Sequence, residues 1–105
     1  MNKICVALLA LLPTTALAFF PIEVEQRLNG AEISYDAREV APNVGGMVLI
    51  NQGQSAASCS ATFRSGPDTP RTRRVTLESG ERANLTARFT RDIMRLRIQL
   101  DCELK

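Results

Sequence analysis

The sequence predicts an all-β domain built from about seven short strands. Apolar and polar residues alternate with a period of two in several segments, as in half-buried strands. Gly, Pro, Asn and Asp residues separate these segments at roughly the 8–12-residue spacing of an all-β fold. Two cysteines fall on the apolar sides of their segments. We expect a single β-sandwich domain over residues 19–105.

Residues 1–18 have the features of a cleaved secretory signal peptide. Lys3 forms a basic start, residues 4–12 are apolar, and Ala16-Leu17-Ala18 matches a small-x-small cleavage site. The apolar run is far shorter than the ~20 residues of a membrane-spanning helix. We therefore expect cleavage following Ala18, no transmembrane anchor, and a periplasmic or extracellular protein.

The first two expected strands cover residues 22–28 and 31–37. Both segments alternate, and Asn29-Gly30 between them suits a two-residue type I′ turn. The sequence therefore predicts an antiparallel hairpin with Leu28 opposite Ala31 and one apolar face.

The middle of the chain is predicted to alternate between short strands and turns. Residues 41–46 are expected to form a connection, and the apolar run 47–50 suits a strand covered on both faces. Two prolines keep residues 65–70 in an irregular turn. The remaining strands are expected at residues 57–64, 75–77, 83–89 and 94–102.

The last two strands are expected to form a hairpin through residues 90–93, with Phe89 opposite Met94 on the apolar face. This register places Arg88 directly opposite Arg95 on the outer face, and Arg97 opposite Thr86. Like charges that face each other across a ladder destabilise a sheet by roughly 0.2–1 kcal/mol. The arrangement favours a docking surface for an anionic partner, and the preceding basic segment extends it. The candidate binding residues are Arg71, Arg73, Arg74, Arg88, Arg95 and Arg97.

The alternative is a solvated arginine face that is neutralised by Glu81, Asp92 or Asp101. The arginine content permits an anionic partner, since 11 of the 13 basic residues are Arg, which binds carboxylate and phosphate in bidentate fashion. The formal net charge is only +2 and the aromatic content is 5%, so nucleic acid is not an expected partner.

Cys59 and Cys102 are predicted to form a disulfide. Cys5 leaves with the signal peptide, and an even pair in an oxidising compartment favours a structural bridge. Because both lie on apolar strand faces, we expect the bridge to join the two packed sheets. Seven short strands with an inward cysteine pair indicate an immunoglobulin-like β-sandwich, although the chain has no Trp to pack against the bridge.

The chemistry available to this sequence favours binding over catalysis. The chain contains no His, which removes the usual general base and the commonest metal ligand. It also lacks G-x-x-x-x-G-K-[ST], G-x-G-x-x-G and G-x-S-x-G, and we expect no catalytic residue, metal or cofactor. Paired carboxylates could hydrolyse a glycoside. The pairs available on shared strand faces are Glu23 with Glu25 and Glu32 with Asp36.

Four features together resemble a family of small, uncharacterised secreted bacterial proteins: residues 21–25 (PIEVE), 28–30 (LNG) and 70–74 (PRTRR), and the cysteine pair. The resemblance covers nearly the whole chain. Some members of the family carry the name 3-phosphoglycerate kinase, but that enzyme has two domains, a nucleotide site and a much longer chain. The resemblance therefore implies a secreted protein and no functional residues.

The sequence leads to two functional hypotheses. The first is a non-enzymatic periplasmic or secreted binding module that docks an anionic partner, such as an envelope protein or an anionic glycan or lipid, through the arginine face. The alternative is a structural or assembly accessory protein that pairs through an exposed strand edge.

Overall fold

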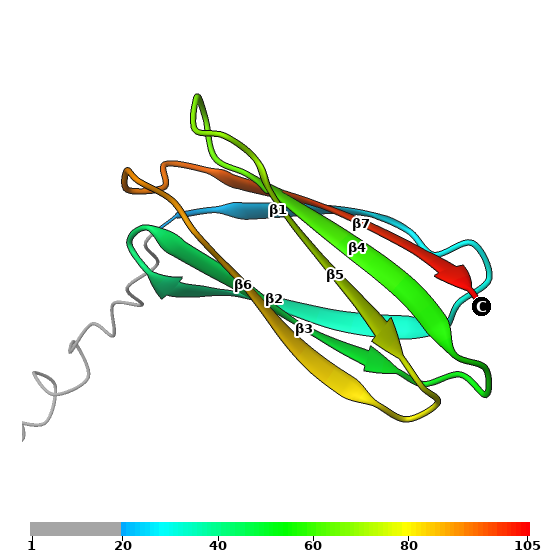
Figure 1. Cartoon of the computed structure of the whole chain (residues 1–105). Coiled ribbons are helices and arrows are strands. Elements are labelled where there is room, and N and C mark those ends of the chain that lie inside the picture. The colour runs from blue at the N-terminus through cyan, green and yellow to red at the C-terminus, as the bar shows by residue number, and fades with distance from the viewer. Residues whose placement is uncertain (1–19) are drawn as a thin grey trace, which may run out of the picture.

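The structure, a computed structural model, describes residues 20–105, and all regular elements in that range are β-strands (Figure 1). The predicted signal peptide, residues 1–18, lies outside the described residues. The described part of the chain has no helix with the length and apolarity of a membrane span. The strands are β1 (Ile22–Arg27), β2 (Ile33–Ala41), β3 (Val44–Asn51), β4 (Ala57–Arg64), β5 (Arg71–Leu77), β6 (Arg82–Arg88) and β7 (Leu96–Leu104).

The seven strands form two sheets that stack as layers (Figure 1). One sheet has the order β1-β7-β4-β5, and the other has the order β2-β3-β6. Inward-facing side chains of both sheets fill the space between them, as in other β-sandwiches. The predicted all-β sandwich of about seven strands is therefore confirmed.

Two predicted boundaries differ from the structure. Only Pro42 and Asn43 separate β2 from β3, so most of the expected connection at 41–46 belongs to strands. Strand β5 begins at Arg71 rather than at Val75, because β4 provides a partner for every residue from Arg71 onward. The run 47–50 is buried on its inner side and half-buried on its outer side, so no second layer covers the outer face.

The predicted hairpin between the first two strands is wrong. The turn itself is present: Asn29 and Gly30 have φ values of 49° and 90°, and the Ala31 amide donates to the Leu28 carbonyl at 2.9 Å. However, the turn joins the two sheets, and β1 pairs in parallel with β7. Apolar alternation identifies which face of a strand is buried, but it does not identify the strand's neighbour.

Charged pairs support the observed parallel register of β1 and β7. Glu23 lies opposite Arg97, with 3.4 Å between Oε1 and Nε, and Arg27 lies opposite Asp101, with 3.9 Å between Nε and Oδ1. Both pairs are exposed, so each adds little stability, but like charges in these positions would disfavour the pairing. One strand of the sandwich is therefore parallel to its neighbour, contrary to the expected antiparallel arrangement.

The predicted hairpin between the last two strands is also wrong. Strand β6 pairs with β3, whereas β7 lies between β1 and β4 in the other sheet. The segment 89–95 crosses between the sheets, and it buries Phe89 and Ile93 in the core. Met94, which we expected on the apolar face, is 84% exposed because its neighbour Ile93 fills the inward position.

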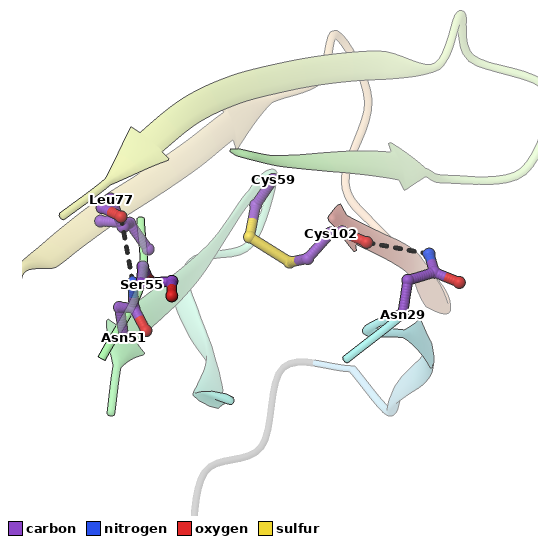
Figure 2. The surroundings of a disulfide bond; sticks show 6 residues. All are labelled: Asn29, Asn51, Ser55, Cys59, Leu77 and Cys102. Atoms are coloured by element: carbon purple, nitrogen blue, oxygen red, sulfur yellow. Dashed lines mark hydrogen bonds between the residues drawn. A yellow bond between two sulfur atoms is a disulfide. The ribbon is translucent and has the colours of Figure 1, made fainter. Parts of the chain in front are cut away.

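The Cys59–Cys102 disulfide is confirmed, but its predicted place between the sheets is wrong. The two residues lie directly opposite each other on β4 and β7, which are neighbours in one sheet, and their Cα atoms are 4.0 Å apart (Figure 2). Cysteines on buried faces can be cross-strand neighbours as readily as partners across a core, and the sequence pattern does not separate the two cases. The bridge therefore links the two central strands of the four-stranded sheet.

The buried Asn51 joins three segments at one end of the sandwich (Figure 2). It is 1% exposed at the end of β3, and its Nδ2 donates to the carbonyls of Ser55 at 2.9 Å and Leu77 at 3.0 Å. Its Oδ1 accepts from the Gly53 amide at 2.9 Å. A buried amide with this set of partners has its hydrogen-bonding capacity largely used, which explains why a polar side chain is stable here.

Gly45 allows the two sheets to approach closely at the start of β7. A Cβ atom at Gly45 would overlap Cδ2 of Leu96, whose side chain is fully buried. Arg95 and Arg97 are the chain neighbours of Leu96, so the contact between Leu96 and Gly45 helps to fix the backbone position of both arginines.

We expect Gly45→Ala to lower the free energy of unfolding by about 1–3 kcal/mol, because the added methyl group overpacks a closed region. Urea denaturation monitored by circular dichroism would measure this change. In a double-mutant cycle, Leu96→Val should reduce the cost of Gly45→Ala, since it shortens the obstructing side chain. Strictly additive effects would show that the Gly45–Leu96 contact does not set the local spacing.

Candidate functional site

The six arginines predicted to form one surface are divided among three places. Arg97 lies near the start of β7 and Arg95 directly precedes that strand, whereas Arg88 ends β6 in the other sheet. The predicted pairing of Arg88 with Arg95 is therefore wrong, and Arg88 lies opposite Val44 of β3 instead. The remaining three, Arg71, Arg73 and Arg74, are on the edge strand β5.

Arg71 and Arg73 connect the two sheets, because they lie on the edge strand β5 and hydrogen-bond to the edge strand β6 of the other sheet. The Nε of Arg71 donates to the Arg88 carbonyl at 3.2 Å, and the Nε of Arg73 donates to the Thr86 carbonyl at 3.0 Å. The Arg71 guanidinium carbon also lies 5.9 Å from the centroid of the Phe89 ring. Both side chains satisfy carbonyls of the edge strand β6, and Arg71 also lies over a core aromatic ring, so these contacts have a structural role.

Arg74 is on the opposite, outer face of β5. It lines a shallow hollow with Asp101 and Glu103, together with small residues of β4. Acidic groups share this surface, and Arg74 therefore does not extend a basic patch.

Two of the predicted arginines and two further ones gather in one hollow of about 400 Å³. Two loops form it, residues 65–70 between β4 and β5 and residues 89–95 between β6 and β7, together with the adjacent strand ends. Both loops lie at the end of the sandwich away from the C-terminus (Figure 1). We call Arg64, Arg91, Arg95 and Arg97 the arginine hollow; Asp68 and Asp92 are the acidic residues that also line it.

Strand register brings two of these arginines into direct opposition. Arg64 on β4 is the cross-strand partner of Arg97 on β7, and both are exposed. A like-charge pair in this position costs roughly 0.2–1 kcal/mol. Glu23 forms an ion pair with Arg97 from the other side. Within residues 20–105, Arg64, Arg91 and Arg95 take part in no ion pair.

The loop that carries Arg91 and Arg95 is anchored at both ends. The Phe89 amide donates to the Asn43 carbonyl at 2.8 Å, and the Ile93 amide donates to the Pro42 carbonyl at 2.8 Å. The side chains of Phe89 and Ile93 are buried. The Arg91 amide donates to Oδ2 of Asp68 at 3.3 Å, which ties this loop to residues 65–70. The backbone that presents the guanidinium groups is therefore held in place before any ligand binds.

The carboxylates considered for catalysis are not assembled around a common point. Glu23 is paired with Arg97, and Asp36 is paired with Arg38 at 2.6 Å between Oδ2 and an Nη atom. Among residues 20–105, no three His, Cys, Asp or Glu side chains are grouped so that they could hold a metal ion. The described surface therefore groups arginines around one hollow and does not group these carboxylates around a common point.

Sequence reasoning identified Arg95 and Arg97 but missed Arg64, Arg91 and the exposed Met94. Arg64 follows the outward-facing residues of the 57–64 strand, which was a usable signal. That Arg64 lies opposite Arg97 follows only from the pairing of β4 with β7, which the sequence does not reveal.

A scan against protein-family models and a search of curated proteins each found no match.

Proposed function

We propose that this protein is a non-enzymatic periplasmic or secreted binding module that docks an anionic partner through the arginine hollow. The observation that carries the proposal is the grouping of Arg64, Arg91, Arg95 and Arg97 around one hollow at the end of the sandwich. The disulfide is compatible with an oxidising compartment, and the predicted signal peptide with cleavage following Ala18 provides the route there.

The charge arrangement favours a bound anion. Arg64 and Arg97 repel each other in the free protein. An anion between or beside them would be attracted to both guanidinium groups and would offset this repulsion. Guanidinium groups also offer fork-shaped pairs of donors that match phosphate and carboxylate oxygens. Because the loop that carries Arg91 and Arg95 is anchored, little ordering of its backbone would be needed on binding.

Calorimetric titration with inorganic pyrophosphate, a small anion with several phosphate oxygens, tests this function. We expect Arg64→Gln and Arg95→Gln each to weaken binding by about tenfold, because a charge-assisted hydrogen bond contributes roughly 1.5–3 kcal/mol and 1.4 kcal/mol corresponds to a factor of ten. The matched control is Arg82→Gln, which removes the same charge from an exposed position on β6. Equal losses for all three variants would show that binding depends on overall charge and not on the hollow.

The alternative function, assembly through an exposed strand edge, has weaker support. The side chains of Arg71 and Arg73 already hydrogen-bond to two backbone carbonyls on the edge strand β6, so these carbonyls are not open to a further strand. The edge strand β2 has a register irregularity between Glu39 and Ala41 and carries the Asp36–Arg38 ion pair, features that discourage edge pairing. Reversing the charges at Arg95 and Arg97 should abolish anion docking and leave edge pairing intact, so the two functions can be separated.

A further inference from the structure

Met94 is the most exposed large apolar side chain among the described residues, and it lines the same hollow as the four arginines. It is 84% exposed, compared with 55% for Val40, the next in order. Its chain neighbour Arg95 belongs to the hollow, and Arg91 lies three residues before it in the same loop. The hollow therefore combines an exposed apolar side chain with four arginines and two aspartates, a set that suits a partner with both apolar and anionic groups.

The fold holds Met94 outward. Ile93 is buried, and its amide is bonded to the Pro42 carbonyl. Leu96, two residues beyond Met94, is fully buried at the start of β7. With both anchors fixed in the core, Met94 cannot turn inward unless the loop is rebuilt.

We infer that this end of the sandwich docks on an anionic phospholipid surface, with Met94 inserted at the boundary of the acyl chains and the arginine hollow bound to headgroup phosphates. The inference rests on the proposed function and specifies its partner. An unbranched thioether on a projecting loop can enter a soft bilayer, while arginine side chains remain at the level of the phosphates. An anionic leaflet also attracts basic groups held at its surface.

Charge and shape favour a bilayer over a glycan or a protein. A glycan would satisfy the arginines but would offer little to the apolar side chain of Met94. A protein partner would present a broad complementary surface, whereas the hollow is confined to two loops and the adjacent strand ends. The facing loop adds Gly66 and Pro67, which are exposed and uncharged, and Asp68, whose Oδ2 accepts a hydrogen bond from the Arg91 amide.

Cosedimentation of the mature protein with vesicles tests the inference. We expect binding to vesicles of phosphatidylcholine mixed with phosphatidylglycerol, and none to vesicles of phosphatidylcholine alone. Met94→Ser should weaken vesicle binding by about tenfold, because it removes most of the apolar area that enters the bilayer. The matched control is Val40→Ser, which removes an exposed apolar side chain from β2 and should bind vesicles as the wild type does.

The outcomes separate the lipid inference from the proposed function. Binding of pyrophosphate without binding of mixed vesicles would overturn the lipid inference and leave anion docking intact. Binding of neither probe would overturn both. Vesicle binding that is equally strong in Met94→Ser and the wild type would overturn insertion, provided that thermal unfolding shows both proteins folded. Binding to an acidic protein in preference to mixed vesicles would also overturn the lipid inference.

Discussion

Replacing both Cys59 and Cys102 with alanine should lower the free energy of unfolding by about 4 kcal/mol. The two cysteines are separated by 43 residues, and the chain-entropy model gives about 4 kcal/mol for closing a loop of that length. Native domains are stable by only about 5–15 kcal/mol, and small domains bury a modest share of their surface. The variant should therefore be close to unfolding at room temperature.

Urea denaturation of the oxidised wild type, the reduced wild type and the double-alanine variant measures this effect. The reduced protein and the variant should have similar midpoints, well below that of the oxidised protein. The double substitution avoids a leftover thiol that could form intermolecular disulfides. Identical midpoints before and after reduction would show that the bridge does not contribute to stability.

Asn51→Ala should be the next most damaging change, with a loss of about 3 kcal/mol. The substitution removes the partner of the Ser55 and Leu77 carbonyls and of the Gly53 amide, and each buried unsatisfied group costs roughly 1–3 kcal/mol. The loss is expected to be smaller than the sum of three such costs, because water can reach the groups near the surface.

Thermal and urea unfolding of Asn51→Ala would test this, with Asn84→Ala as the matched control. Asn84 lies on β6 and is exposed, so its replacement should change the free energy of unfolding by less than about 0.5 kcal/mol. Hydrogen exchange of the Gly53 amide gives an independent readout, since that amide should lose protection in Asn51→Ala. Similar stabilities for the two variants would show that the Asn51 hydrogen bonds are not needed to hold this end of the sandwich.

The sequence was a good guide to where strands occur and a poor guide to which strands are neighbours. Alternation located β4 with the same bounds that the structure has, because the pleat alone determines which side chains share a face. The Asn29-Gly30 turn was also identified, since its positive φ values are a local requirement. The partner of β1 was missed because the choice of β7 depends on contacts between the two ends of the domain.

For the candidate site too, the sequence identified individual residues but not which residues lie next to each other in the fold. Arg95 and Arg97 were identified from an assumed pairing with β6 that is wrong, and the like charge that faces Arg97 is Arg64. The prediction of facing arginines was applied to the wrong neighbouring strand, since Arg97 faces Arg64 of β4 and not a residue of β6. Only the sheet order brings the two loops of the arginine hollow together.

The parallel pairing of β1 with β7 has a consequence for the timing of folding. β1 comes first in the chain and its partner comes last, with Ile22 paired to Leu96. During synthesis, β1 cannot pair with β7 until nearly the whole chain has been made. Pairings over such long separations fold slowly, typically in milliseconds to seconds. The edge strand β1 can therefore join its sheet only after the last strand of the domain has been made.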